Sequence, residues 1–194
     1  MLEREVKLLF ANAEEARGAI VASGATPLRP RRLQDDALFD SDSQSFGRRG
    51  CVLRLRTERR SARLPPDLVL VTFKGPVQPG TMKIREEHET VVADGDVIVR
   101  VFEALGLQVW FRYQKFREEF STGDATVAVD ETPVGTFVEI EGAEQAIVSI
   151  AAALGRSPAD FILGSYRSLF LERREQFRLP GNDMVFASVP DAGE

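Results

Sequence analysis

The stretch Leu2-Glu3-Arg4-Glu5-Val6-Lys7-Leu8 decides the expected fold of this chain. Successive side chains of a β-strand point to opposite faces, so Glu3, Glu5 and Lys7 share one face. The opposite face is mostly apolar and carries Leu2, Arg4, Val6 and Leu8. A single strand of this kind is typical of a sheet with one solvated face. Because later strands repeat the pattern, with charges of both signs on one face, the sequence predicts a charged interior.

The composition fits one globular domain and excludes several classes of protein. The chain has 194 residues, of which 28% are charged and 43% hydrophobic, which is ordinary for a soluble protein. Its net charge of −5 produces no field that would favour nucleic acid or an anionic membrane. The single cysteine, Cys51, excludes an internal disulfide and a cysteine-based zinc site. No run approaches the ~18 apolar residues of a membrane span, and charges interrupt any signal peptide, so we expect a cytoplasmic protein.

Hydrophobic alternation and capping residues predict the elements of the chain. Strands are expected over residues 2–8, 51–57, 68–74, 82–92, 107–120, 125–131 and 136–141, and residues 29–39 are expected to be extended. Helices are expected over 12–23, 94–105, 143–154, 157–163 and 165–175, with Asn12 and either Asp94 or Asp96 as N-caps. Residues 58–67 are expected to form a hairpin loop. This order predicts an α+β fold with an antiparallel barrel and helices packed outside it. We expect one domain over residues 1–177 and an irregular C-terminal tail over 178–194.

Charged residues on one face of each strand define a candidate site. The basic members are Lys7, Arg54, Arg56, Lys74, Arg85, Lys115 and Arg117, and the acidic members are Glu3, Glu5, Glu87, Glu89, Asp130, Glu139 and Glu141. Carboxylates without histidine or cysteine partners suit hard cations such as Mg²⁺, Mn²⁺ or Ca²⁺. Arginine and lysine side chains suit phosphate oxygens. If all these faces point into one lumen, the combination indicates a polyphosphate ligand together with a metal.

Ordered motifs along the chain resemble one known family. Glu3-Arg4-Glu5-Val6-Lys7 has the Glu-x-Glu-x-Lys signature of the CYTH, or triphosphate tunnel metalloenzyme, superfamily. The similarity continues in Leu53-Arg54-Leu55-Arg56, Phe73-Lys74-Gly75-Pro76, Arg85-Glu86-Glu87-His88-Glu89, Lys115-Phe116-Arg117, Asp130, the run 135–141 and Ser165-Tyr166. It covers roughly residues 1–170. The superfamily includes class IV adenylyl cyclases, thiamine triphosphatases and inorganic triphosphatases.

The resemblance implies an eight-stranded antiparallel barrel, the triphosphate tunnel, and assigns roles to its residues. Metal ligands, or neighbours of ligands, would be Glu3, Glu5, Glu139 and Glu141, with Glu87 and Asp130 as further candidates. The triphosphate would be held by Lys7, Arg54, Arg56, Lys74, Arg85, Lys115 and Arg117. Glu3, Glu5, Lys7 and Glu141 would form the catalytic group, with Mg²⁺ or Mn²⁺ as cofactor. The expected partner is a triphosphate-containing small molecule, with neither nucleic acid nor membrane, and a homodimer is left open.

Some residues depart from the family pattern or admit two interpretations. Phe39-Asp40-Ser41 replaces the Tyr-x-Asp-Thr of many members, and Arg167 follows Ser165-Tyr166 where some members have a nearby lysine, a difference that could alter substrate choice. His88 falls on the face opposite Glu87, which favours a surface or packing role. The aromatic residues 110, 111 and 113 could stack on a base or thiazole ring, although core packing is favoured.

Three functions remain compatible with the sequence. The leading hypothesis is a metal-dependent triphosphatase, in which one metal clamps the phosphates and a second activates water. The alternative is an adenylyl cyclase, in which the 3′-hydroxyl of ATP attacks the α-phosphorus and pyrophosphate leaves. The third is a module that binds polyphosphate without turnover. Hydrolysis leads because it requires only the tunnel, whereas cyclisation also requires recognition of adenine.

Overall fold

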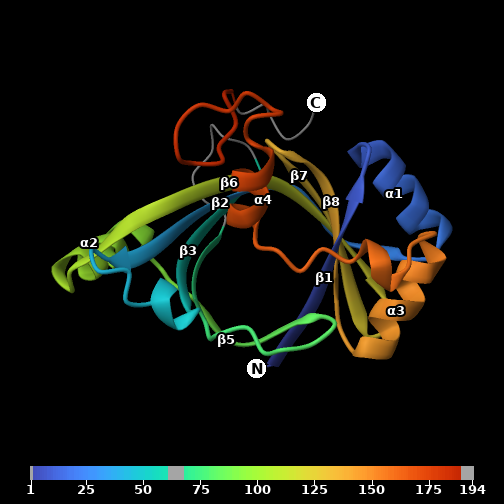
Figure 1. Ribbon diagram of the computed structural model, residues 1–194, viewed down its shortest axis with the longest axis horizontal. Helices are drawn as coiled ribbons and strands as arrows, with labels where there is room; N and C mark the ends of the chain where they lie inside the picture. The colour runs from blue at the N-terminus through green and yellow to red at the C-terminus, as the bar shows by residue number, and fades with distance from the viewer. Residues whose placement is uncertain (1, 61–67, 189–194) are drawn as a thin grey trace.

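Eight strands form a closed antiparallel barrel in the computed structural model, which describes residues 2–60 and 68–188. Their order around the barrel is β1-β5-β4-β3-β2-β6-β7-β8, and β8 pairs with β1 to close it (Figure 1). The strands are β1 (Leu2–Phe10), β2 (Thr26–Ser41), β3 (Val52–Arg59), β4 (Leu68–Lys74), β5 (Lys83–Val91), β6 (Leu107–Thr122), β7 (Ala125–Thr132) and β8 (Gly135–Glu141). The predicted barrel is confirmed. The predicted loop over 58–67 begins later than expected, because residues 58 and 59 still pair with β2, and residues 61–67 lie outside the described part.

The helices lie outside the barrel wall, as predicted (Figure 1). They are α1 (Ala13–Ala22), α2 (Gly95–Ala104), α3 (Glu144–Ala153) and α4 (Tyr166–Arg173), with 3₁₀ turns η1 (Gly47–Arg49) and η2 (Pro158–Asp160). The side chain of Asn12 accepts a hydrogen bond from the amide of Glu15 at 2.9 Å, and that of Asp94 accepts one from Val97 at 3.0 Å. Both residues therefore satisfy amides that a helix start leaves unpaired.

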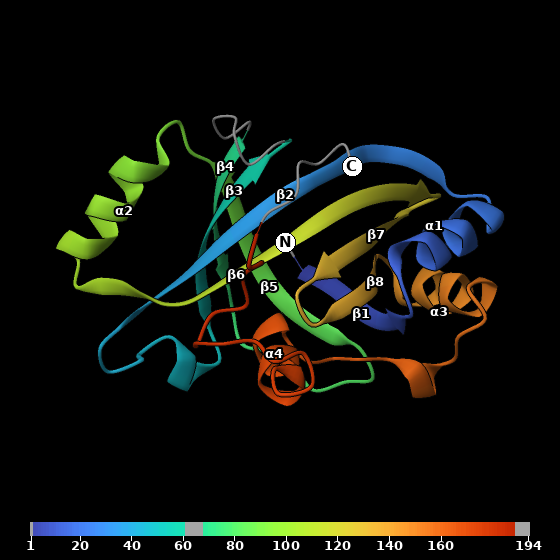
Figure 2. The same ribbon diagram turned by 90° about the horizontal axis from the view of Figure 1, so that it is seen from above.

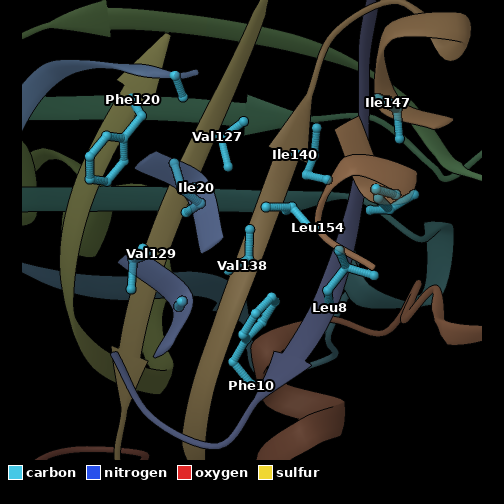
Figure 3. Close-up of a cluster of buried hydrophobic side chains, with 14 of the residues drawn as sticks. Leu8, Phe10, Ile20, Phe120, Val127, Val129, Val138, Ile140, Ile147 and Leu154 are labelled. Atoms are coloured by element: carbon cyan, nitrogen blue, oxygen red, sulfur yellow. The ribbon is translucent and has the colours of Figure 1, made fainter. Parts of the chain in front are cut away.

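The main hydrophobic core lies between the outer wall of the barrel and helices α1 and α3 (Figure 3). Leu8 of β1 is opposite Val138 of β8, and both are fully buried beneath the helices. Ile20 of α1 and Ile147 of α3 are also fully buried in this cluster. Each such side chain contributes about 1.5–3 kcal/mol when it leaves water. The apolar face of β1 therefore points outward, and its charged face is left to line the interior.

A second hydrophobic cluster attaches α4 and the chain after it to the barrel. Phe170 of α4 is fully buried, and its ring centroid lies 5.9 Å from that of Phe111 in β6. Met184 is also fully buried, and its backbone exchanges hydrogen bonds with Arg112 at 3.0 Å and Gln114 at 2.8 Å. Residues 178–188 contain no helix or named strand, and Met184 pairs with Tyr113 of β6. Residues 189–194 lie outside the described part.

Strand β1 also pairs with a short extended segment at Ile162, and this pairing could not be predicted from the sequence. Strand β5 pairs with β1 only over residues 2–5 of β1. Beyond them, the amide of Lys7 donates to the carbonyl of Ile162 at 3.1 Å, and the amide of Ile162 donates to the carbonyl of Lys7 at 2.9 Å. The helix predicted over 157–163 is therefore wrong apart from the turn η2, because the chain becomes extended to pair with β1.

Helix α2 stands apart from the other helices, at the far end of the long strands β2 and β6 (Figure 2). Its residues are all at least partly exposed. Within the described residues, no helix has the length and apolar character needed to cross a membrane.

Candidate active site

A cavity of about 770 Å³ occupies the barrel interior and receives side chains from strands β1 to β6 and β8 and from the start of α4. The structure brings together nearly all the predicted site residues along its wall. These are Glu3, Glu5, Lys7, Arg54, Arg56, Lys74, Arg85, Glu87, Lys115, Arg117, Glu139 and Glu141. Their placement agrees with the expectation of one charged lumen, and their roles as ligands stay predictions.

Lys7 lies at the centre of a buried group of ions. Its ammonium lies 2.8 Å from Glu5 Oε1 and 3.1 Å from Glu139 Oε2, and its side chain is 2% exposed. Burial acts to lower the pKa of this lysine, but the two carboxylates outweigh it and hold the pKa above its usual range. Lys83 of β5 also pairs with Glu5. Alternation places Lys83 on the same face as Arg85, yet the sequence analysis did not include it in the site.

Asp130 anchors the site from behind and does not line the cavity. Its Oδ2 lies 2.8 Å from Lys115 Nζ, its Oδ1 accepts from Arg117 Nε at 2.6 Å, and the Tyr166 hydroxyl also donates to it. Asp130 is fully buried. Both oxygens of Asp130 contact the cations of Lys115 and Arg117, which line the cavity, and its role as a metal ligand stays a prediction.

Lys115 and Arg117 carry positive charge on the cavity wall of β6. Arg117 Nη2 also lies 2.6 Å from Glu139 Oε1. Burial, together with repulsion from Arg117, lowers the pKa of Lys115 to about 7 despite the attraction of Asp130. An anion placed beside Lys115 would restore its full charge.

The arginines of β3 share an acidic partner on β2. Asp36 is fully buried and accepts from Arg56 Nε at 2.8 Å, while Arg54 Nε lies 3.4 Å away. Arg54 also donates to Thr72 at 2.9 Å and to Glu89 at 3.1 Å. The sequence gives no signal for the role of Asp36, which lies in the segment 29–39 that is expected only to be extended.

Carboxylates gather beside Lys74, whose ammonium lies 2.9 Å from Glu3 and 2.6 Å from Glu87. Desolvation and a hydrogen bond shared with Glu87 raise the pKa of Glu3 to about 8. Burial opposes ionisation of Glu87 as well, but the hydrogen bond from Glu3 and the charge of Lys74 lower its pKa to about 2. The environment thus favours the neutral form of Glu3 and the charged form of Glu87.

Glu141 is the carboxylate of this set that contacts no cation. It lies at the exposed end of β8, and its side chain makes no hydrogen bond or ion pair with any part of the chain that the structure describes. Desolvation at the cavity wall, with repulsion from Glu139 and Glu5, raises the pKa of Glu141 to about 7.

Arg85 uses its guanidinium to hold two loops at the cavity. It donates to the carbonyl of Gly75 at 2.8 Å and to that of Gly50 at 3.1 Å. Its predicted contact with phosphate stays a prediction. The side chain of His88 is 62% exposed and lies 3.1 Å from Glu86, and it also lines the cavity.

The donor chemistry of the cavity fits a hard divalent cation. Glu3, Glu5, Glu87, Glu139 and Glu141 supply carboxylate oxygens, the ligands that Mg²⁺ and Mn²⁺ prefer. Over residues 2–60 and 68–188, no three acidic, histidine or cysteine side chains already form a metal cluster. Most of the carboxylates instead contact lysine or arginine. Burial is the main cause of the raised pKa values of Glu3 and Glu141, and a cation bound among these carboxyl groups would favour their charged forms.

The sequence of this chain matches the model of the CYTH domain over residues 1–160. The chain belongs to the CYTH domain family. A Methanocaldococcus jannaschii relative named "Putative adenylate cyclase MJ0240" is 25% identical over 142 residues, covering 73% of this chain and 77% of the relative.

Two solved structures show the same CYTH fold. A "putative adenylate cyclase" from Vibrio parahaemolyticus has a TM-score of 0.74 and 19% identity, covering 88% of this chain and 98% of the other. A "putative adenylyl cyclase" from Hippeastrum, described as having a dominant triphosphatase activity, has a TM-score of 0.64 and 14% identity over 88% of this chain and 95% of the other. At these identities, both structures support the fold alone.

The pKa of Glu3 makes the stability of this CYTH protein depend on pH when divalent cations are removed. Folding raises this pKa from 4.5 to about 8. Between these values the folded state keeps a proton that the unfolded chain has lost, so stability falls as pH rises. Glu141, with its pKa raised to about 7, acts in the same direction. We expect the free energy of unfolding, measured with urea and a chelator, to fall by about 1 kcal/mol per pH unit between about pH 5 and 7.

The variant Glu3→Gln removes one of the two groups and is expected to make this decrease shallower. Lys115 opposes the trend only above about pH 7, because its pKa in the folded protein is lowered to about 7. Equal pH slopes in the variant and the unsubstituted protein would contradict the assignment to Glu3.

Proposed function

We propose that this protein is a metal-dependent phosphohydrolase that acts on a triphosphate bound in the barrel cavity. The observation that carries the proposal is the shared cavity: lysines and arginines from β1, β3, β4 and β6 face carboxylates from β1, β5 and β8 across one space. A triphosphate carries several charges along a short chain and needs cations on more than one side. Phosphoryl transfer depends mainly on positioning and charge stabilisation, which such an arrangement supplies.

Binding of phosphate would exchange partners within the existing ion pairs. The planar guanidinium groups of Arg56 and Arg117 can each donate two hydrogen bonds to two oxygens of one phosphate. The ammonium of Lys7 supplies a compact positive charge. Each is now held in place by Asp36, Asp130 or Glu139, so the cations are oriented before the ligand arrives. This orientation reduces the conformational entropy that binding has to overcome.

The carboxylates around Glu3, Glu5, Glu139 and Glu141 would hold Mg²⁺ or Mn²⁺. When bound, such an ion neutralises charge on phosphate oxygens and makes water a better nucleophile. Glu141 has no cation partner among the described residues, and the proton on Glu3 can be released, so both can take part without breaking an arginine contact. Asp130 keeps Lys115 and Arg117 in place throughout.

An adenylyl cyclase is the second candidate. The M. jannaschii relative and the V. parahaemolyticus structure carry cyclase names, whereas the Hippeastrum protein is described as mainly a triphosphatase. Hydrolysis requires a held triphosphate and a water molecule. Cyclisation also requires the ribose 3′-hydroxyl to be held against the α-phosphorus. A module that only binds polyphosphate is the third candidate, and the complete carboxylate set disfavours it because such a set is costly without a cation.

Separate incubation with ATP, thiamine triphosphate and tripolyphosphate, each with Mg²⁺ or Mn²⁺, tests the proposal. We expect orthophosphate release that a chelator abolishes, with products resolved by ion-exchange chromatography. Cyclic AMP and pyrophosphate would favour the cyclase. Binding without turnover of any of the three would favour the binding module. Glu86→Gln supplies a matched control, because Glu86 lies on β5 beside Glu87 and its side chain is 65% exposed.

The variant Arg56→Ala is expected to raise KM for the triphosphate about 10- to 100-fold, with a smaller change in kcat. Loss of the charged, bidentate hydrogen bonds from the guanidinium weakens binding of the substrate and of the transition state by similar amounts. Steady-state kinetics measures both constants. Arg59→Ala is the control, because Arg59 lies on the same strand and does not line the cavity. An unchanged KM in Arg56→Ala would show that Arg56 serves Asp36 alone.

A further inference from the structure

We propose that Trp110 and Arg167 form a stacking platform that binds a planar aromatic group attached to the triphosphate, and so make the protein select nucleoside triphosphates over inorganic triphosphate. This inference rests on the proposed function, and it names the residues that would choose the substrate.

The cavity changes character along its length. Leu38 and Gln34 both line it, and they lie four residues apart on β2, which separates them by about 13 Å along the strand. Around Gln34 the wall is ionic, because Glu58 contacts the Gln34 amide at 2.6 Å and also pairs with Arg29. Around Leu38 the wall includes the apolar residues Val52 and Trp110, next to Arg54, which lies opposite Leu38 on β3. We call this apolar part the α4 end, because Arg167 of α4 lines it as well.

Trp110 and Arg167 face each other at the α4 end. The guanidinium carbon of Arg167 lies 4.9 Å from the centroid of the Trp110 ring, within the range of a cation–π contact. Trp110 is half-buried and packs against the second hydrophobic cluster, with its ring centroid 6.1 Å from that of Phe111. The indole therefore both packs against the core and lines the cavity. Phe111, by contrast, is buried, as predicted for core packing.

Arg167 differs from the other arginines of the cavity in its partners. Arg54, Arg56 and Arg117 each contact a carboxylate. Within residues 2–60 and 68–188, the side chain of Arg167 forms no ion pair or hydrogen bond, and its guanidinium lies over the Trp110 ring. A guanidinium that is not held by an acid can slide or rotate over the indole. It can therefore admit a flat ring and cover its second face.

The chemistry of the platform favours a neutral aromatic ring. Nucleobases stack on indole and guanidinium planes without needing a fixed hydrogen-bond pattern. A cationic ring, such as the thiazolium of thiamine triphosphate, would be repelled by Arg167. The cavity of about 770 Å³ lies within the range of roughly 300–1,000 Å³ that encloses an organic ligand. A triphosphate held by Lys115 can extend along β6 toward Trp110, since both residues line the same space.

The single tryptophan of the chain makes the first test direct. Trp110 is the one tryptophan in the sequence, so its intrinsic fluorescence reports only on this position. Titration of the protein with ATP in the presence of Mg²⁺ is expected to quench the emission, and titration with tripolyphosphate is expected to leave it nearly unchanged. This readout does not depend on turnover. Equal responses to the two ligands, or ATP binding by calorimetry without quenching, would overturn the proposal.

Variants at the platform provide the second test. Trp110→Leu is expected to lower the ratio of kcat/KM for ATP to that for tripolyphosphate about tenfold or more, whereas Trp110→Phe retains a ring and should recover part of it. Arg167→Gln should lower the same ratio and raise turnover of thiamine triphosphate relative to ATP. Melting curves of Trp110→Leu and Trp110→Phe show whether either variant is misfolded.

The variant Gln34→Met tests whether the aromatic group binds at the other, ionic end of the cavity. If this variant lowers the ratio and the Trp110 variants do not, the aromatic group lies at the ionic end of the cavity and the platform proposal is wrong. Failure of the proposed function has a different pattern, because no triphosphate would then release orthophosphate even where ATP quenches Trp110.

Discussion

The variant Glu141→Gln is expected to lower Mg²⁺- or Mn²⁺-dependent turnover at least about 100-fold while leaving the barrel folded. Glu141 lies at the cavity wall near Glu5 and Glu139, and the repulsion between these carboxylates contributes to raising its pKa to about 7. A cation bound among them would relieve that repulsion. Glutamine keeps the shape of the side chain but supplies no negative charge, so the metal would be held weakly.

Glu141 gives a cleaner test than Glu5, because the two residues differ in their partners. Glu5 contacts both Lys7 and Lys83, and its removal would leave buried cations unpaired. Glu141 contacts no cation in the part of the chain that the structure describes, so no ion pair is lost. Turnover is measured by orthophosphate release, and metal affinity by calorimetry. Unchanged turnover in Glu141→Gln, with Glu86→Gln as the control, would remove Glu141 from the metal site.

The variant Asp130→Ala is expected to cause the largest loss of stability, about 3–5 kcal/mol. Asp130 is fully buried and holds Lys115, Arg117 and the Tyr166 hydroxyl. Without it, Lys115 can lose its proton, because its pKa is already lowered to about 7. Arg117 cannot lose its proton, so its charge would be shared by Glu139 alone.

Thermal unfolding followed by circular dichroism measures this effect, and a fall of about 10 °C in Tm is expected for a chain of this size. Glu86→Ala removes an exposed carboxylate from β5 and should change stability by less than about 0.5 kcal/mol. A similar Tm for Asp130→Ala and Glu86→Ala would show that the buried cations are stabilised by other groups.

The inward and outward faces of the barrel could be predicted from the sequence because the side-chain period of a strand is two. In β1 this period places Glu3, Glu5 and Lys7 on one side and Leu8 on the other, and the structure agrees. The same alternation placed Arg54 and Arg56 of β3 on the cavity wall. The face on which a side chain lies follows from its position along the strand, and this position can be read directly from the sequence.

The burial of each charged side chain and the identity of its ion-pair partners could not be predicted, because both depend on contacts between segments that are distant in the sequence. Asp130 is fully buried and does not line the cavity, and its carboxylate is bonded to Tyr166, which follows 36 residues later in the chain. Asp36 meets Arg56 only because β2 pairs with β3. Ser157-Pro158 starts a helical turn as its local sequence indicates, yet pairing with Lys7 draws Ile162 out of any helix.

The backbone contact between Ile162 and Lys7 has a consequence for how this protein can diversify. The match to the family ends at residue 160, whereas Ile162 and the helix that carries Arg167 come after it. Arg167 therefore reaches the cavity wall from a segment that main-chain hydrogen bonds attach to β1, and these bonds do not depend on the side chain at position 162. Substitutions in this segment can change the α4 end of the cavity while the charged residues of the strands stay in place.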